Sequence, residues 1–206
     1  MVVRMAINMK RIEGSLEVKT GLHIGGIKET VKIGGLDNPV IKIRDGKHYL
    51  PYIPGSSIKG RLRSLLEEKY GENNALIKKV FGSQPGDNNE IGRGSVIFRD
   101  AYLEDKESYF ENGNLIKEKL FEIKPENKID RKSGKAEHPR FIERVVPGTK
   151  FRLEIVIVYK SDEELKNMEE LLKEGFELLQ DSYLGGSGTR GYGKVDVSDI
   201  INKLKS

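Results

Sequence analysis

The sequence predicts an α+β fold whose core elements follow the order strand, helix, strand, strand, helix, strand. Two segments repeat apolar residues at helical spacing, and they begin near Ser56 and Ser161. Segments with the alternation or composition of strands surround them, at residues 12–20, 94–103, 150–159 and 194–200. Two long segments, residues 21–53 and 104–149, interrupt this order and are predicted to be insertions into the core.

Length and composition limit the classes of protein that fit. A chain of 206 residues suits one domain with insertions, and we predict a single domain over residues 1–206. The absence of cysteine excludes disulfides and thiolate metal sites. A polar N-terminal segment and the lack of a long apolar run favour a cytoplasmic protein without a membrane span. The net charge of +4, with 33% charged residues, fits either a heat-adapted, solvated surface or a mildly basic RNA-binding one.

The first strand and the first helix enclose the first insertion. Residues 12–20 alternate apolar and polar side chains, and the two Gly-Gly pairs after them predict a long loop with some β structure. A Pro-Gly pair then ends the extended segment, and Ser56 or Ser57 is predicted to cap a helix. The apolar stripe of this helix consists of Ile58, Leu62, Leu65 and Leu66.

The middle of the chain holds a short helix, a strand and the second insertion. The helical piece ends at Phe81, and a strand is predicted over residues 94–103. Residues 121–149 are predicted to form a protruding hairpin or loop, because a turn signal at Ser133-Gly134 lies between two basic arms.

The last three elements complete the core. Residues 150–159 alternate regularly and predict a strand, and Ser161 with Glu164 forms a capping box at the start of the second long helix. A final strand over residues 194–200 follows a glycine-rich turn. Without its insertions this order is the βαββαβ arrangement of a ferredoxin-like or RRM-like sandwich.

The glycine-rich turn matches the G-x-G-x-x-G spacing of dinucleotide-binding sites between Gly186 and Gly191. Those sites follow a strand and precede a helix, whereas here a helix comes first, so the order argues against a dinucleotide. Two interpretations remain. The segment is a flexible turn that uses glycine for positive φ, or it is a backbone platform for a phosphate or ribose, with charge from Arg190.

Lys59 and Arg63 are four residues apart and therefore share one face near the start of the first helix. Charged residues on a helix usually form a solvated face. Here the Gly55-Ser56-Ser57 entry adds unpaired N–H groups beside both cations, which favours an anion site suited to an RNA backbone.

The tract over residues 121–149 has a small excess of basic residues, as a solvated loop also has. Phe141 and Ile142 near its stem would let such a hairpin reach a neighbouring subunit or wedge between bases.

Asp37 lies in a Gly/Pro loop, where an acidic residue usually forms an Asx turn. The alternative is a catalytic carboxylate that holds Mg²⁺ near a scissile phosphate or orients an attacking hydroxyl. His23 belongs to the same insertion and either contacts RNA or satisfies a loop carbonyl. His48 and His138 show no metal-ligand spacing and receive no role.

Six motifs occur in an order that resembles one family: TGLHIGG, GLDNPVIK, LPYIPGSSIKGRLRSLLE, IFRDAYL, ENKIDRKSGKAEHPRFIERV and DSYLGGSGTRGYGKV. They are similar to the RAMP-superfamily backbone subunits of type III-A CRISPR effectors, the third-subunit family of the Csm complex. The resemblance covers roughly residues 12–197. Each motif alone is weakly specific, and their order is what carries the resemblance.

The resemblance implies a ribonucleoprotein of antiviral defence in which copies of the chain stack along a guide RNA beside other Csm subunits. A thumb hairpin, matched by residues 121–149, flips out base pairs between guide and target RNA. The implied RNA-binding residues are His23, Ser56, Ser57, Lys59, Arg63, Arg131, Gly185, Gly186, Ser187, Gly188 and Arg190.

Asp37 falls on the catalytic aspartate of that family, which implies endoribonuclease cleavage of target RNA with Mg²⁺ or another divalent cation. The implied chemistry is attack by the adjacent 2′-hydroxyl, which leaves a 2′,3′-cyclic phosphate and a 5′-hydroxyl. Because one aspartate is a small active site, the RNA itself must supply the in-line geometry, and the isolated chain is expected to be a poor enzyme.

Four alternatives remain. The chain is the equivalent backbone subunit of a type III-B complex, or an inert filament subunit that binds RNA without cutting it. A guide-maturing nuclease of the same superfamily would carry a histidine near the first helix, and residues 56–70 contain none. A nucleotide-dependent oxidoreductase would need the strand–glycine–helix order that is missing here.

Overall fold

The computed structural model describes residues 7–26, 38–83, 92–129 and 131–204, without the side chains of residues 128 and 136–138. The helices are α1 (Gly55–Tyr70), α2 (Ala75–Phe81), α3 (Asp162–Asp181) and α4 (Ser198–Lys203). The strands are β1 (Asn8–Val18), β2 (Lys42–Asp45), β3 (His48–Ile53), β4 (Val96–Phe98), β5 (Ala101–Leu103), β6 (Phe110–Glu111), β7 (Asn114–Leu115), β8 (Phe121–Ile129), β9 (Ala136–Val145), β10 (Lys150–Tyr159) and β11 (Val195–Asp196).

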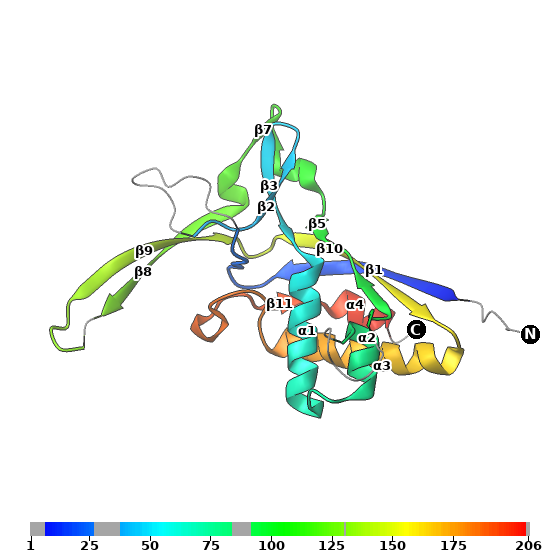
Figure 1. Cartoon of the computed structure of the whole chain (residues 1–206). Helices are drawn as coiled ribbons and strands as arrows, with labels where there is room; N and C mark the ends of the chain where they lie inside the picture. Colours follow the sequence, from blue (N-terminus) through cyan, green and yellow to red (C-terminus); the bar gives the residue numbers. More distant parts are fainter. Residues whose placement is uncertain (1–6, 27–37, 84–91, 130, 205–206) are drawn as a thin grey trace, which may run out of the picture.

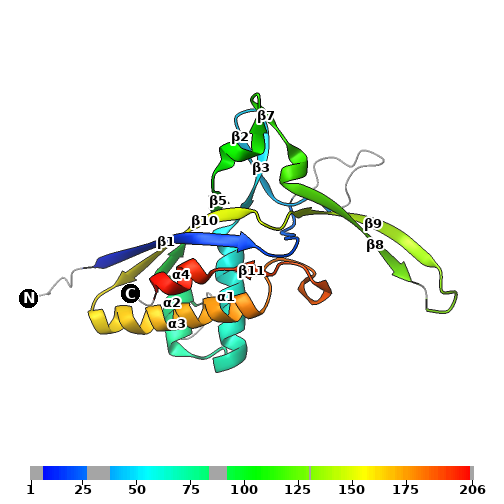
Figure 2. The same cartoon turned by 180° about the vertical axis from the view of Figure 1, so that it is seen from behind.

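The central sheet is antiparallel, with strand order β11-β1-β10-β5-β3-β2 and with β4 also paired to β10. In chain order, β1, α1, β4 with β5, β10, α3 and β11 form the predicted βαββαβ core. The four helices cover one face of this sheet, as Figure 1 shows from one side and Figure 2 from behind. The predicted ferredoxin-like α+β fold is confirmed.

Apolar periodicity explains why the long elements form where the sequence places them. Phe151, Leu153, Ile155 and Ile157 alternate along β10 and are fully buried on the side of the helices. Ile58, Leu62 and Leu66 on α1 are also fully buried, as are Met168, Leu172, Phe176 and Leu179 on α3. The two helices and the sheet therefore bury one continuous apolar core.

Asp100 accounts for two differences from the predicted elements. The strand predicted over residues 94–103 is split into β4 and β5, and the register against β10 changes by one residue between them. At the break, the Asp100 carboxylate accepts a hydrogen bond from the Gly55 N–H at 2.8 Å. The helix α1 consequently begins at Gly55. The prediction that Ser56 or Ser57 caps it was wrong, because Pro54 is the cap residue and makes no side-chain cap bond.

The predicted cap of α3 is confirmed. The Ser161 hydroxyl accepts a hydrogen bond from the Glu164 N–H at 3.2 Å, and the Glu164 carboxylate accepts one from the Lys160 N–H at 2.6 Å. The first bond satisfies an N–H group that the first helical turn leaves without an intrahelical partner, and the second ties the residue before the cap to the helix.

The C-terminal end departs from the predicted strand over residues 194–200. The strand β11 has only two residues, because the Asp196 carboxylate accepts the Ser198 N–H at 3.0 Å and starts α4. From α4 the Asp199 carboxylate reaches back to β1 and accepts the Ser15 N–H at 2.9 Å. Helical spacing buries Val197, Ile200, Ile201 and Leu204.

The hairpin of β8 and β9 projects from one end of the sheet, with the predicted Ser133-Gly134 turn between its strands (Figures 1 and 2). It pairs in one antiparallel ladder with an irregularity between Glu126 and Lys128. The hairpin predicted for residues 121–149 is confirmed. In the part of the chain described here, no helix is long and apolar enough to cross a membrane.

Candidate RNA interface

Four segments that are distant in sequence meet where the hairpin joins the sheet. They are the loop after β1, the segment before β2, the end of β9 at the base of the hairpin, and the glycine-rich loop between α3 and β11. Their traces run close together at one end of the molecule in Figures 1 and 2. Backbone hydrogen bonds join the first three, since Leu22 pairs with Val145 and Ile24 accepts the Ile41 N–H at 2.8 Å. Predicted site residues lie on two of these segments.

His23 connects three of the segments. Its Nδ1 donates a hydrogen bond to the Glu143 carbonyl oxygen at 2.8 Å, which assigns the proton to Nδ1 because a carbonyl only accepts. Its own carbonyl oxygen accepts the Gly186 N–H at 2.9 Å. The half-buried His23 ring is therefore held in one orientation beside the glycine-rich loop.

The glycine-rich loop has a defined conformation that requires its glycines. Gly185 has a φ of +78°, and a Cβ on it would collide with the His23 carbonyl oxygen. A Cβ on Gly188 would collide with the ring of Tyr183. The predicted loop is thus a packed backbone surface between α3 and β11, and the helix before it and strand after it agree with the argument against a dinucleotide site.

Arg61 fixes this loop to α1. Its guanidinium donates to the Tyr183 carbonyl oxygen at 2.9 Å and to the Ser182 hydroxyl at 2.5 Å. The same group stacks on the Tyr183 ring, 4.1 Å from the centroid, and that ring packs against Gly188. Arg61 therefore sets the position of the glycine-rich loop relative to the helix that carries Lys59.

Tyr192 fixes the loop to the hairpin. Its ring is 1% exposed, and Lys124 and Arg144 each lie 4.5 Å from its centroid. The Tyr192 hydroxyl donates to Glu126 at 2.6 Å, and Arg190 pairs with the other Glu126 oxygen at 2.9 Å. Burial, followed by the hydrogen bond to Glu126, raises the pKa of Tyr192 to about 12. Part of the charge predicted for RNA at Arg190 is thus neutralised within the chain.

Glu143 fixes the segment that follows Asp37. Its carboxylate is buried, accepts the Val40 N–H at 2.9 Å and pairs with Lys42 at 2.8 Å. Its backbone N–H donates to the Asn38 carbonyl oxygen at 3.1 Å. Asp37 itself lies outside the described residues, but the residue after it is anchored on the same Glu143 backbone that holds His23.

The remaining predicted residues lie apart from this cluster. The Arg63 guanidinium contacts Glu67 at 2.7 Å and the Gly82 carbonyl oxygen at 3.2 Å. Arg131 is exposed in the turn at the tip of the hairpin. Lys59 is half-buried on α1 and makes no hydrogen bond or ion pair within the described part of the chain.

Ser56 and Ser57 lie in the first turn of α1. There the Gly55 N–H is taken by Asp100 and the Ser57 N–H by the Pro54 carbonyl oxygen. Fewer N–H groups remain for an anion than the sequence indicated, and the Asp100 carboxylate lies beside them.

Sequence reasoning assigned no role to Glu143, Arg61, Tyr192 or Glu126. Only Glu143 carries a signal in the sequence, because it is an acidic residue within the apolar run of FIERVV and so predicts a buried partner. The partners of the other three depend on contacts with distant segments.

A divalent cation would find few protein ligands among the described residues. No group of three histidine or acidic side chains converges in the ranges the structure covers. The buried carboxylate nearest the cluster, Glu143, is already neutralised by Lys42. The described donor set therefore does not fit a protein-enclosed metal site, and it leaves Asp37 as the candidate ligand.

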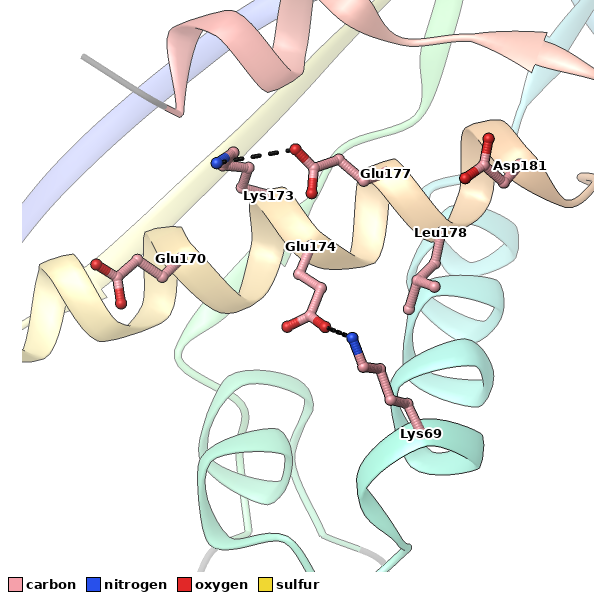
Figure 3. A pocket seen from close by; sticks show the side chains of 7 residues that line it. All are labelled: Lys69, Glu170, Lys173, Glu174, Glu177, Leu178 and Asp181. Carbon is pink, nitrogen blue, oxygen red and sulfur yellow. Dashed lines mark hydrogen bonds and ion pairs between the residues drawn. The ribbon is translucent and has the colours of Figure 1, made fainter.

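A groove of about 440 Å³ lies elsewhere, between the end of α1 and α3 (Figure 3). Figure 3 shows Lys69 of α1 directed at Glu174 of α3, and Lys173 pairs with Glu177 at 3.8 Å. Acidic side chains outnumber basic ones in its lining, which makes it a poor site for RNA phosphates. The groove is lined by Lys69, Glu170, Lys173, Glu174, Glu177, Leu178 and Asp181.

The fold and the cluster define a ferredoxin-like sandwich of the kind that RNA-recognition domains use, extended by a hairpin and a glycine-rich loop. The profile of the RAMP superfamily matches residues 15–196. The protein named "CRISPR system Cms endoribonuclease Csm3" in Methanocaldococcus jannaschii is 45% identical over 92% of this chain and 78% of its own length. The protein of the same name in Streptococcus thermophilus is 38% identical over 95% of this chain and 88% of its own.

A solved structure agrees with these relatives. The crystal structure of a Csm3–Csm4 subcomplex of the type III-A CRISPR–Cas interference complex matches with a TM-score of 0.54 and 33% identity, over 91% of this chain and 74% of that one. The chain belongs to the RAMP superfamily and, within it, to the Csm3 family of CRISPR endoribonucleases.

Proposed function

We propose that the chain is the guide-RNA-binding backbone subunit of a type III-A CRISPR complex and that it cuts target RNA paired with the guide. One observation carries the proposal. Asn38, the residue after Asp37, is anchored on Glu143 beside His23 and the glycine-rich loop. The candidate catalytic loop and the candidate RNA-binding loop thus start from one point of the molecule, at the base of the hairpin.

The guide RNA would run along the end of the sheet where these segments meet. The backbone of Gly185–Gly188 lets a phosphate or ribose approach closely, while Lys59 and Arg190 supply positive charge. Ser56, Ser57 and Arg63 would extend the path along α1 away from the cluster, where Arg63 would exchange its contacts with Glu67 and the Gly82 carbonyl oxygen for RNA. His23 supports the loop through its carbonyl oxygen and keeps its Nε2 edge for RNA.

The hairpin would act on the duplex of guide and target. Arg131 at its tip is exposed and basic, which suits a phosphate contact away from the cluster. Further copies of this chain and the other subunits of the complex are the proposed protein partners. The single domain over residues 1–206 and the cytoplasmic location remain predictions.

The proposed reaction is transesterification at a target phosphate. The 2′-oxygen forms a bond to phosphorus and gives up its proton, and the bond to the 5′-oxygen breaks as that oxygen gains a proton. The products are a 2′,3′-cyclic phosphate and a 5′-hydroxyl. Asp37 would orient or deprotonate the 2′-hydroxyl, and the splayed RNA would supply the in-line geometry.

Mg²⁺ or another divalent cation would be held by Asp37 and by phosphate oxygens of the RNA, since the described residues offer no enclosed site. When bound there, such an ion would offset negative charge on the reacting phosphate. No role in the reaction is assigned to Glu143, because its carboxylate is taken by Lys42 and by the Val40 N–H.

The test uses the guide complex reconstituted with wild-type chain or with Asp37→Ala. We expect the variant to lose target cleavage by at least about a hundredfold while target binding is unchanged, because a lost catalytic group costs two or more orders of magnitude. EDTA should abolish cleavage by the wild type. The matched control is Asp181→Ala, an exposed aspartate at the end of α3, which should cut at the wild-type rate.

Two results would contradict the proposal in different ways. A complex with Asp37→Ala that cuts normally would remove Asp37 from the chemistry and leave an RNA-binding subunit. A wild-type complex that binds target without cutting it would support the inert filament subunit.

A further inference from the structure

The face of the sheet opposite the helices carries an aromatic pair. Tyr52 of β3 and Tyr102 of β5 are direct register partners, and Tyr102 is also the partner of Arg152 on β10. Their neighbours in sequence, Ile53 and Ala101, are fully buried on the helix side. Because side chains alternate along a strand, the two tyrosines and Arg152 form a cross-strand row on the other face.

The two rings are stacked, with centroids 6.1 Å apart and planes 23° from parallel. Tyr102 is 48% exposed and Tyr52 is half-buried. Solvent-facing aromatic rings in a preformed stack leave a π face that a planar group can cover at little entropic cost.

Arg152 is exposed beside this pair and takes part in no ion pair within the described part of the chain. The nearest carboxylate along its strand, Glu154, is engaged by Arg11 at 3.5 Å and by Arg99 at 3.9 Å. A free guanidinium next to an exposed aromatic stack is the combination that single-stranded nucleic acids bind, one group for the base and one for the phosphate.

The aromatic pair also borders the candidate RNA interface. Tyr52 lines a small cavity together with Ile24, Val40 and Ile41, on the two segments that flank His23 and follow Asn38. A strand of RNA that leaves the interface would therefore meet the tyrosines next.

We propose that Tyr102 and Tyr52 form a stacking site for an unpaired nucleobase of single-stranded RNA, with Arg152 contacting an adjacent phosphate. The site shares its ligand class with the proposed function but none of its residues. On one side of the pair the row continues from Tyr102 to Arg152 and then to Ser15, whose hydroxyl donates to Glu104 at 3.2 Å, so this side is polar. A single base fits such surroundings better than the apolar surface of another protein.

The test is binding of a short single-stranded RNA that carries 2-aminopurine, measured on the full chain by anisotropy and by quenching of the 2-aminopurine fluorescence. We expect Tyr102→Ala to weaken binding about tenfold and to reduce the quenching, because one base loses its aromatic partner. The Tyr102→Phe control keeps the ring and should match the wild type. Arg152→Gln should lower the slope of log K against log salt by about 0.7.

Tyr102→Leu serves as a second variant if the alanine variant fails to fold, because leucine keeps apolar area without a π face. An unchanged dissociation constant and unchanged quenching in both Tyr102→Ala and Tyr102→Leu would overturn the proposal. Unchanged RNA binding combined with lower self-association by sedimentation would also overturn it and would make this face an interface between copies.

Lys59→Ala, measured in parallel, separates this proposal from the proposed guide path. A loss of RNA affinity in Lys59→Ala, with none in the Tyr102 variants, would contradict the stacking site and leave the proposed guide path standing. A loss in the Tyr102 variants with none in Lys59→Ala supports the stacking site and counts against the guide path along α1.

Discussion

The body of the sandwich and the end that carries the candidate interface share one apolar core, but the interface end also depends on buried polar contacts. In the body, α1, α3 and β10 meet through fully buried apolar side chains. At the interface end, the Glu143 carboxylate of β9 binds the segment that leads into β2, and the Tyr192 hydroxyl binds Glu126 of β8. Apolar packing is non-directional and follows the area buried, whereas a buried hydrogen bond depends on two particular atoms. The comparison teaches that the body determines stability and that the interface end determines local geometry.

The largest expected effect is the loss of stability in Phe176→Ala, which changes the body of the sandwich. Phe176 of α3 is fully buried, and its removal leaves a cavity, so we expect the free energy of unfolding to fall by about 3–5 kcal/mol. Urea denaturation followed by circular dichroism measures this loss. The exposed neighbour Glu177→Ala is the control and should change the free energy by less than about 0.5 kcal/mol. A loss in Phe176→Ala as small as that of the control would contradict the comparison.

A smaller and local effect is expected from Glu143→Ala at the interface end. Without the carboxylate, the Val40 N–H and the Lys42 ammonium lose their acceptor, which should lower the free energy of unfolding by about 2 kcal/mol. Amide hydrogen exchange should rise most at Val40, and at the buried Ile155 in β10 by no more than the loss in free energy of unfolding accounts for. The exposed Glu13→Ala is the control. Equal acceleration at both amides would show that the two regions are not independent.

The smallest effect concerns pH. The hydrogen bond from Tyr192, helped by the nearby Arg190 charge, lowers the pKa of Glu126 below its ordinary value of 4.5. A lowered pKa in the folded state stabilises the fold above about pH 4.5, and this contribution is lost as the pH falls through the folded-state pKa.

The Glu126→Gln variant lacks the stabilisation by the ionised carboxylate. Its free energy of unfolding should therefore be lower than that of the wild type by about 1 kcal/mol at pH 7, and the two should converge in acid. Thermal unfolding from pH 7 down to pH 3 measures both curves. Glu118→Gln, at an exposed glutamate with no ion pair in the described part of the chain, is the control for a change of charge alone. Parallel curves for Glu126→Gln and the wild type would remove Glu126 from the contact that holds the loop to the hairpin.

The sequence predicted well those elements whose alternation of apolar and polar residues follows directly from which side chains are buried. The strand β10 was predicted over the same residues that the structure assigns, because its alternation continues without a break. The Ser161 cap was also predicted correctly, since its partner Glu164 is close in sequence.

The errors arose where a polar contact between distant residues decides the local structure. The start of α1 and the break between β4 and β5 both depend on the Asp100–Gly55 hydrogen bond, which spans 45 residues. The end of β11 depends on Asp196, whose contact with Ser198 competes with a strand that hydropathy alone favoured.

The candidate site was likewise predictable in its local motifs and not in its contacts between distant segments. Motif order placed His23 and the glycine-rich loop among the RNA-binding residues, and the structure brings them into contact. The contacts of Glu143 and Tyr192 were not predictable, because they join the hairpin to segments far away in sequence. The catalytic role of Asp37 remains a prediction, because Asp37 lies outside the described residues. The next residue, Asn38, is described and is bonded to Glu143.

The contact between Asp199 and Ser15 has a consequence for solubility. The strand β1 lies next to the short β11, so much of its outer ladder would otherwise be open to another chain. Open ladders recruit further strands and lead to aggregates. By satisfying the Ser15 amide with a carboxylate from α4, the chain blocks this route where β11 ends. The chain thereby keeps the outer edge of β1 from accepting a strand of another chain at this point.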